Sequence, residues 1–316
     1  MRLNSKVMEK QNAVIVKNLV KTYAHVEALK EISLNVKKGE LFGVIGPDGA
    51  GKTSLFRIMS SLLLPDSGEV NVLGIDVTRD YASIRKKMGY MPGRFSLYQD
   101  LSIEENINLF ASIYDTTLEE NYDNIRYIYS QIEPFRKRRA GALSGGMKQK
   151  LALCCALVHS PEILFLDEPT TGVDAVSRSE FWEILQMLKK RGMTILVSTP
   201  YMDEASLCDR VALMQDGRIL SVDTPAKITA AYAYSLVAIK TNEKYNMLSS
   251  LRMLEQATLV YPFGENIHVV SDKGKLTSEE LTKYLSAQGM ENWEIVEAAP
   301  DIEDCFIALM NQHVAA

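Results

Sequence analysis

Short apolar runs alternate with helical periodicity along the first 225 residues, which is the pattern of an α/β fold. The nearly continuous apolar runs 41–45 and 163–166 are typical of parallel strands buried on both faces. Other runs are rich in branched residues and bounded by turn residues, so they are predicted to be strands too. These further strands are expected at 13–20, 32–36, 69–73, 89–92, 193–199, 211–214 and 219–222.

Helices are predicted where apolar residues recur every three or four positions. One helix is expected over 53–63, one from about 144 to 158, and one over 177–190. Helical periodicity also extends from about residue 102 to residue 133. Because this block interrupts the α/β pattern, residues of about 94–150 are expected to form an inserted helical subdomain.

From about Ala226 the pattern changes to β-α-β-β-α-β followed by a last helix. This order predicts a small α+β sandwich of the ferredoxin-like type. Two domains are therefore expected, an α/β domain over 1–225 and a C-terminal extension over 226–316. The extension is predicted to contain strands at 235–241, 258–262, 267–271 and 293–297 and helices at 246–254, 277–287 and 302–310.

A glycine-rich turn follows the first nearly continuous apolar run. Gly46, Gly51, Lys52 and Thr53 fill the pattern G-x-x-x-x-G-K-[ST]. Glycines let the backbone wrap around phosphate oxygens with its N–H groups pointing inward, and the helix N-terminus adds positive charge there. Lys52 is expected to reach the β- and γ-phosphates of a nucleotide and Thr53 to bind Mg²⁺. The candidate binding residues are Gly46, Pro47, Asp48, Gly49, Ala50, Gly51, Lys52, Thr53 and Ser54.

Two adjacent carboxylates end the second nearly continuous apolar run. Asp167 and Glu168 would be costly at the end of a buried strand if they had only a structural role. Asp167 is predicted to organise Mg²⁺, as the acidic residue does in phosphate-loop enzymes. Glu168 is then placed to polarise an attacking water.

A second helix N-terminus also carries glycines. Ser144 is predicted to cap this helix, while Gly145 and Gly146 leave its first N–H groups accessible to an anion. Ser-Gly-Gly alone is equally compatible with an ordinary loop. Tyr23, just after the first predicted strand, has a ring that either stacks on an adenine or packs half-buried. The residues alone leave both interpretations open.

The composition, with 47% hydrophobic and 24% charged residues among 316, is that of an ordinary globular protein. A net charge of −5 argues against nucleic acid as the main partner. No apolar run approaches the roughly 18 residues that cross a bilayer, and residues 1–10 lack the apolar region of a signal peptide. The four cysteines show no metal-binding spacing and fit buried thiols of a reducing compartment. A cytoplasmic protein is expected.

Together, these motifs resemble those of the ATP-binding subunits of ABC transporters, over residues of about 13–225. The resemblance implies that 46–53 is the phosphate loop, that 143–149 is the signature, and that Asp167 and Glu168 serve Mg²⁺ and the attacking water. A single copy of each motif argues against the tandem translation-factor relatives. The interval between phosphate loop and signature is too short for the long coiled coil of chromosome-maintenance ATPases.

The resemblance also implies a head-to-tail dimer. ATP bound at Lys52 of one subunit would be covered by the signature helix, with Ser144, of the other. Tyr23 would stack on the adenine, and the loop that contains Asp174 would lie at the dimer contact. ATP would hold the dimer together until hydrolysis, which moves separate membrane permease subunits between states. The C-terminal extension is similar to that of ATPase subunits of ABC-2 type exporters, including the segment 301–309.

Two positions depart from the family pattern. Gly93 stands where the family usually has a glutamine that contacts Mg²⁺ and the attacking water, and Pro200 where it usually has a histidine that contacts the γ-phosphate. Glycine has no side chain, and proline offers neither an imidazole nor a backbone N–H. One lost contact costs about 3 kcal/mol of transition-state stabilisation, by analogy with oxyanion donors. Gln99 lies too far along the chain to be expected to replace the missing amide.

The leading hypothesis is an ATPase subunit of an exporter that lies on the inner face of the cell membrane and contacts its permease through residues 94–99. It is expected to bind ATP well and hydrolyse it slowly, while its signature serves a partner in a heterodimer. The alternative is a homodimer that hydrolyses ATP with Glu168 alone. A regulatory scaffold that dimerises on ATP without transport is a second class, and a nucleic-acid ATPase is disfavoured by the negative charge.

Overall fold

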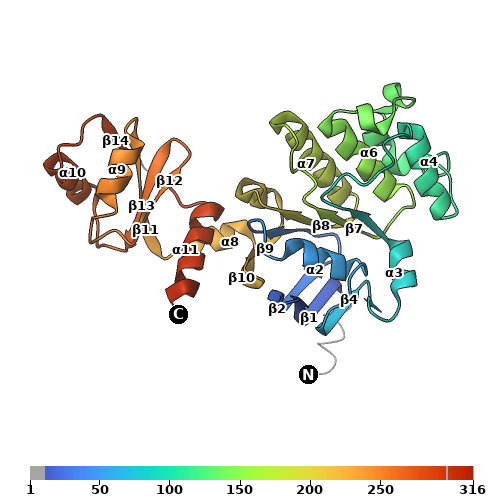
Figure 1. The fold of residues 1–316 in the computed structure, drawn as a ribbon, viewed down its shortest axis with the longest axis horizontal. Helices are drawn as coiled ribbons and strands as arrows, with labels where there is room; N and C mark the ends of the chain where they lie inside the picture. The colour runs from blue at the N-terminus through green and yellow to red at the C-terminus, as the bar shows by residue number, and fades with distance from the viewer. Residues whose placement is uncertain (1–10, 297, 316) are drawn as a thin grey trace. The chain divides into compact units, whose positions relative to one another are not determined.

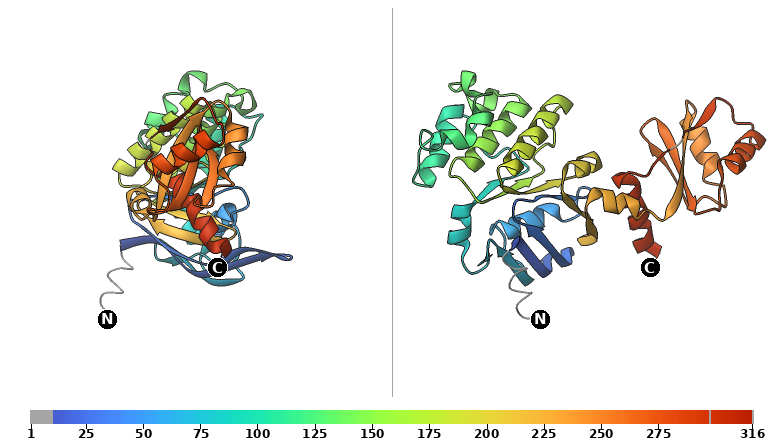
Figure 2. Two further views of the ribbon diagram at one scale, coloured as in Figure 1. Left: turned by 90° about the vertical axis from the view of Figure 1, so that its left-hand side faces the viewer. Right: turned by 180° about the vertical axis from the view of Figure 1, so that it is seen from behind.

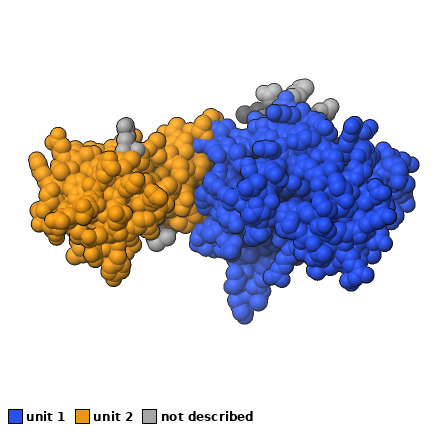
Figure 3. All heavy atoms as spheres, turned by 90° about the horizontal axis from the view of Figure 1, so that it is seen from above, with its two compact units in different colours: residues 1–225 blue, residues 226–316 orange. Residues whose placement is uncertain are grey.

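The computed structural model describes residues 11–296 and 298–315, so the polar segment 1–10 lies outside the described residues. The chain divides into two compact units, residues 1–225 and 226–316 (Figure 3). Each unit has its own hydrophobic core. No helix in the described part of the chain is both long enough and apolar enough to cross a membrane.

The first unit is built on a six-stranded sheet in which the strands from β9 to β6 are parallel (Figure 1). Strands β3, β7 and β8 are buried along their whole length, as continuous apolar sequences predict. The carboxyl ends of parallel strands share one edge of a sheet, and the candidate residues follow β3 and β7 at that edge. Across the sheet the order is β10 (Arg218–Asp223), β9 (Arg210–Gln215), β3 (Leu41–Ile45), β8 (Thr194–Thr199), β7 (Ile163–Asp167) and β6 (Met88–Met91).

A second, antiparallel sheet contains strands longer than the sequence predicted. The expected strands 13–20 and 32–36 are parts of a hairpin whose pairing runs from Asn12 with Lys37 to Tyr23 with Val26. Cross-strand hydrogen bonds carry both strands through polar residues that an apolar pattern does not mark. The order in this sheet is β2 (Val26–Lys37), β1 (Asn12–Tyr23), β4 (Ser67–Val72) and β5 (Ile75–Asp76).

Helix α2 (Lys52–Met59) packs in the core between the two sheets. Its Phe56 meets Phe165 of β7 edge to face, with ring centroids 6.2 Å apart. The helix ends before the predicted residue 63 because the Ser60 hydroxyl donates back to the Phe56 carbonyl and Ser61 adopts a φ of 57°. The contact of Phe56 with β7 fixes α2 in the core, directly after the glycine-rich turn.

The predicted helical block is not continuous. It contains α4 (Ile103–Ile113) and α5 (Tyr122–Tyr129), separated by a turn in which Asp115 has a φ of 54°. Ser102 and Glu105 form a capping box that starts α4. Figures 1 and 2 show these helices grouped with α6, away from α2. The unit also contains the longer helices α3 (Tyr81–Lys87), α6 (Gly145–Leu157) and α7 (Ala175–Lys190).

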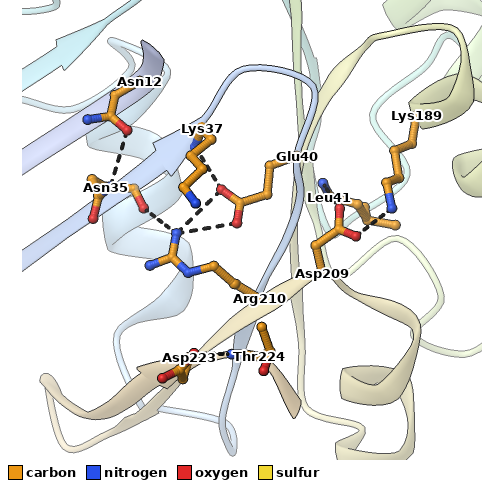
Figure 4. Close-up of polar contacts among 10 residues, drawn as sticks. All are labelled: Asn12, Asn35, Lys37, Glu40, Leu41, Lys189, Asp209, Arg210, Asp223 and Thr224. Atoms are coloured by element: carbon orange, nitrogen blue, oxygen red, sulfur yellow. Dashed lines mark hydrogen bonds and ion pairs between the residues drawn. The ribbon is translucent and has the colours of Figure 1, made fainter. Parts of the chain in front are cut away.

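A buried ion pair holds the start of β3 (Figure 4). Glu40 is 7% exposed, and Arg210 Nη1 lies 3.3 Å from its Oε1 atom. Glu40 Oε2 also accepts a hydrogen bond from the Lys37 backbone at 2.7 Å. Next to it, Asp209 accepts a hydrogen bond from the Leu41 N–H at 3.0 Å. These contacts join β2, β3 and β9 and so support the strand that leads into the glycine-rich turn.

The second unit begins with α8 (Pro225–Ala230), which spans the boundary, and has a β-α-β-β-α-β order before its last helix. Its antiparallel sheet has the order β12-β13-β11-β14, and α9 and α10 pack on one face through Met247 and Leu281. Helix α11 contacts the other face, where Asp304 lies 2.7 Å from His268 Nδ1. The elements are β11 (Tyr234–Thr241), α9 (Lys244–Leu251), β12 (Leu259–Phe263), β13 (Asn266–Asp272), α10 (Ser278–Ala287), β14 (Trp293–Val296) and α11 (Ile302–Ala315).

Candidate nucleotide site

The turn between β3 and α2 packs closely against the neighbouring strands β2, β8 and β9. The Gly46 N–H donates a hydrogen bond to the Thr199 carbonyl at 3.2 Å. A Cβ atom on Gly46 would lie 2.1 Å from the Met214 carbonyl oxygen, and one on Gly51, whose φ is 102°, would lie 2.4 Å from the Ala28 carbonyl oxygen. Only glycine fits either position. Pro47, Asp48, Gly49 and Ala50 complete the turn.

Lys52 begins α2 and directs its ammonium group back into the turn. The side chain is 3% exposed and donates hydrogen bonds to the carbonyl oxygens of Gly46 at 2.8 Å and Pro47 at 2.9 Å. Its Nζ atom also lies 3.1 Å from Glu168 Oε1. A buried ammonium group requires such partners. They hold the positive charge inside the turn, beside the end of β7.

Asp167 ends β7 and is 2% exposed. Its Oδ1 atom accepts hydrogen bonds from Ser198 Oγ at 2.6 Å and Thr53 Oγ1 at 3.2 Å. Burial raises the pKa of this carboxyl above its usual value, and the opposing effect of the two hydrogen bonds does not cancel the rise. A carboxylate beside a hydroxyl offers the oxygen ligands that Mg²⁺ prefers, so Thr53 and Asp167 fit a magnesium ion.

Glu168 adopts a left-handed backbone conformation, with a φ of 50°. Its N–H group is held by Ser198, both by the carbonyl at 3.1 Å and by the hydroxyl at 3.0 Å. Such a conformation costs free energy in a residue other than glycine, and the contacts with Ser198 hold it here. It turns the chain away from the strand, and the Glu168 side chain, 21% exposed, reaches Lys52. A carboxylate that is both ordered and open to solvent is suited to polarise water.

Tyr23 lies at the end of β1, next to the start of α2. Its hydroxyl is 3.2 Å from Ser54 Oγ, and the Lys21 ammonium lies 5.7 Å from its ring centroid. Tyr23 is 42% exposed. The fold therefore brings this ring beside the turn and leaves part of its surface accessible, as base stacking requires. Stacking on adenine stays a prediction.

Comparisons with known proteins agree with this geometry. Residues 29–171 match the model of the ABC transporter family. Over 306 residues the chain is 30% identical to the Nod factor export ATP-binding protein I of Rhizobium sp. (strain N33), covering 96% of this chain and 98% of that protein. The chain belongs to the family of ABC transporter ATP-binding proteins. ATP hydrolysis is the activity of this family.

Two further ABC proteins are similar. The chain is 37% identical over 287 residues to the probable multidrug ABC transporter ATP-binding protein YbhF of Escherichia coli (strain K12). These residues are 90% of this chain and 49% of YbhF, so the chain spans about half the length of that relative. The dimeric cassette MJ0796, solved with ADP and Pi in a post-hydrolysis state, matches with a TM-score of 0.61 and 28% identity, covering 67% of this chain and 98% of that one. The predicted α/β ATPase fold is confirmed.

The residues that the resemblance assigns to the signature lie at a helix N-terminus, as predicted. Ser144 Oγ accepts a hydrogen bond from the N–H three residues further on in α6, at 3.4 Å. Gly145 and Gly146 form the first turn, and a Cβ atom on Gly146 would lie 2.5 Å from Ser177 Oγ, so α6 packs closely against α7. Asp174 caps α7 through the Ser177 N–H at 3.0 Å, and this hydrogen bond lowers the pKa of Asp174.

The signature and the phosphate loop do not meet within one chain. Figures 1 and 2 show α6 and α7 on the other side of β7 and β8 from α2. The start of α2 contacts Tyr23, Asp167 and Glu168, whereas α6, which Ser144 caps, lies on the other side of the two strands. This separation is what a dimer with each signature over the other subunit's nucleotide requires.

Of the two departures from the family pattern, Gly93 lies beside the carboxylates and Pro200 follows a residue that contacts the glycine-rich turn. A Cβ atom on Gly93 would lie 3.0 Å from the Asp167 carbonyl oxygen and 3.6 Å from Glu168 Cβ. Pro200 follows β8 directly, after the residue whose carbonyl holds the first N–H of the phosphate loop. Gln99 lies instead against Gly141, whose N–H donates to the Gln99 carbonyl at 2.9 Å.

Ser198 is a residue of the site that the sequence analysis missed. It joins Asp167 and Glu168 through its hydroxyl and its carbonyl. In the sequence, residues 193–199 were interpreted only as a buried strand. The available signal was a hydroxyl residue within an apolar run, because a buried hydroxyl requires a hydrogen-bond partner.

Proposed function

We propose that this chain binds MgATP at residues 46–53 and couples ATP binding and hydrolysis to export through separate membrane permease subunits. The observation that carries the proposal is the convergence of Lys52, Thr53, Asp167 and Glu168 after β3 and β7 in an ABC protein. The printed names of relatives, among them a Nod factor export protein and a probable multidrug transporter protein, favour export. The site would lie at the inner face of the cell membrane.

Each residue has a distinct task in this mechanism. Lys52 exchanges its carbonyl partners for the β- and γ-phosphates of ATP. Thr53 and Asp167 would hold Mg²⁺, which would supply positive charge that neutralises the phosphates. Glu168, released from Lys52, orients the attacking water and accepts its proton. The Ser198 hydroxyl holds the Asp167 carboxylate and the backbone N–H of Glu168 in place throughout.

A second ATP-binding subunit would complete the site. In each half of such a dimer, the helix capped by Ser144 would cover the γ-phosphate held by Lys52 of the other half, with Asp174 near the contact. Because Gly93 and Pro200 remove two groups that would contact the γ-phosphate and the water, we propose that the site with this chain's own Lys52 hydrolyses slowly. Its partner would then be a different subunit with a competent site.

ATPase assays of the chain purified with its partner test this assignment. Replacing Glu168 with Gln should leave most of the turnover, because the partner's site supplies it, whereas the equivalent change in the partner should remove it. The reverse result would reject the heterodimer and favour a homodimer that hydrolyses with Glu168 alone. Lys52→Ala should abolish ATP binding by this chain.

A regulatory scaffold that dimerises on ATP without transport is the alternative function. Extraction in mild detergent distinguishes the two, because an export subunit should purify with membrane permease subunits. A chain found only with other soluble proteins would favour the scaffold.

A further inference from the structure

A buried carboxylate lies just beyond Pro200. Glu204 belongs to the short helix η3 (Met202–Leu207) and is 1% exposed. Its Oε1 atom accepts a hydrogen bond from Thr170 Oγ1 at 2.9 Å, while Arg178 Nε lies 3.8 Å away. Among the residues that the structure describes, Glu204 Oε2 has no hydrogen-bond partner. A carboxylate buried with so few partners costs free energy, so its position calls for a role beyond packing.

Thr170 links this carboxylate to the loop after β7. It is 1% exposed and lies two residues beyond Glu168. Within the loop, the Val173 N–H donates to the Thr170 carbonyl and the Thr171 N–H to the Glu168 carbonyl, each at 3.3 Å. These bonds shape the loop locally. The Thr170 hydroxyl, in contrast, ties the loop to a segment more than thirty residues further along the chain.

The C-terminal end of the loop also contacts the segment that contains Glu204. Arg178 lies in the first turn of α7, after the cap Asp174, and donates a hydrogen bond to Asp203 Oδ2 at 2.7 Å. Its guanidinium group also lies 4.8 Å from the ring centroid of Tyr201. The segment after β8 thus forms hydrogen bonds with both ends of the loop, with Thr170 near its start and with Arg178 just after its end.

We propose that Glu204 is a positioning residue for ATP hydrolysis. By holding Thr170, it maintains the left-handed turn at Glu168 and the path of the chain to Asp174. The inference rests on the proposed function, because it assigns Glu204 to the same site. Without the hydrogen bond between Thr170 and Glu204, Glu168 loses its orientation while the loop around Lys52 is unchanged. Catalysis therefore falls and ATP affinity does not.

Matched substitutions in the full-length chain test the hydrogen bond between Thr170 and Glu204. They are assayed with a partner subunit whose equivalent glutamate is replaced by glutamine, so that the measured turnover comes from this chain's own site. Thr170→Val removes the hydroxyl at nearly constant volume, and Thr170→Ser retains it as the control. Thr170→Val and Glu204→Met are expected to lower kcat about tenfold or more, with the KM for ATP changed less than about twofold. Thr170→Ser, and Glu204→Gln, which keeps an acceptor, should retain most of the turnover.

Hydrogen exchange on the nucleotide-free chain supplies a readout that does not depend on ATP. The N–H groups of Thr171 and Val173 should exchange faster in Thr170→Val than in the wild type, with no change in Thr170→Ser or in α2. Unchanged exchange in Thr170→Val, or a kcat at the wild-type level, would overturn the proposal. If the wild-type chain bound no ATP, the proposed function would fail, and the exchange comparison would still decide whether Glu204 holds the loop.

Discussion

Lys52 and Glu168 neutralise each other across 3.1 Å in the protein alone. A triphosphate carries more negative charge than one carboxylate, so it competes effectively for the lysine. In the proposed mechanism, Lys52 turns to the phosphates and frees Glu168 to act on water, while the Glu168 backbone is still held by Ser198. The same two side chains would thereby link nucleotide binding to activation of the base.

Restoring the two missing groups should accelerate hydrolysis at this chain's own site. The variant Gly93→Gln with Pro200→His is expected to raise kcat about tenfold or more, because each polar contact to the transition state contributes up to about 3 kcal/mol. A Cβ atom at position 93 would meet the Asp167 carbonyl at 3.0 Å, a contact that a shift of a few tenths of an ångström relieves.

Steady-state turnover of the restored variant should be compared with that of Gly93→Ala, which adds the Cβ atom without the amide. The alanine variant is expected to stay as slow as the wild type. Equal turnover in all three proteins, at equal ATP affinity, would show that these two positions do not limit hydrolysis.

The raised pKa of Asp167 predicts a pH-dependent stability. Since the folded protein binds this proton more tightly than the unfolded chain, the contribution of Asp167 to stability falls as pH rises from its ordinary pKa of 3.8 through the raised one. In the absence of Mg²⁺, Asp167→Asn is therefore expected to raise Tm at pH 7, with a gain that shrinks toward pH 4.

The pKa of Asp174 is shifted in the opposite direction, so its effect on stability has the opposite pH dependence. The Ser177 N–H lowers its pKa, so its charge stabilises the fold above its ordinary pKa and that stabilisation is lost as pH falls. Asp174→Asn should lower Tm slightly at pH 7. Thermal unfolding across the pH range measures both variants, and a lower Tm for Asp167→Asn at pH 7 would contradict the assignment of burial as the dominant cause.

At the scale of elements, the ion pair of Glu40 and Arg210 supports the strand that carries the phosphate loop (Figure 4). Arg210→Met would leave the Glu40 carboxylate buried without its cation, at an expected cost of about 3–5 kcal/mol in the free energy of unfolding. The double variant Glu40→Met with Arg210→Met should recover most of that loss, because it removes both charges.

Urea unfolding measures these differences. Lys189→Met is the matched control, since Lys189 pairs with Asp209 at a more exposed position, where an ion pair contributes at most about 1 kcal/mol. A double variant as unstable as Arg210→Met alone would mean that the loss came from packing rather than from the unpaired charge.

Some elements could be predicted from the sequence and others could not. Strands β3 and β7 were predicted almost to their ends, because a strand buried on both faces requires an uninterrupted apolar run. The extension of β2 back to Val26 was missed, since its polar residues are held by pairing with β1, a contact that no local pattern encodes. The break at Asp115 was missed because periodicity continues on both sides of it.

At the scale of the whole molecule, two separate cores predict two unfolding transitions. At a hundredfold excess over Kd, MgATP should raise the free energy of unfolding of the unit with residues 1–225 by about 2.7 kcal/mol, and calorimetry should show a higher Tm for that transition and no shift of the other. In the second unit, burial would raise the pKa of Asp304, but hydrogen bonds from His268 and Tyr261 hold it below its usual value. Asp304→Leu removes that network and should lower only the second transition.

A comparison of the two perturbations tests whether the two units unfold independently. ATP and Asp304→Leu should act on different transitions, and Asp304→Asn, which keeps an acceptor for Tyr261, should have the smaller effect. One cooperative transition that both perturbations move would contradict independent unfolding of the two units.

The sequence by itself determined the phosphate loop, the paired carboxylates Asp167 and Glu168, and the cap at Ser144. Each of these is a local pattern, in which neighbouring residues must have the backbone freedom or charge that the chemistry requires. Only the tertiary structure decided that Ser198 holds the Asp167 carboxylate and the Glu168 backbone, that Glu204 holds Thr170, and that α6, which Ser144 caps, lies on the other side of β7 and β8 from α2. Such contacts join segments far apart in sequence, so their energy depends on how the strands and helices pack and not on the order of residues.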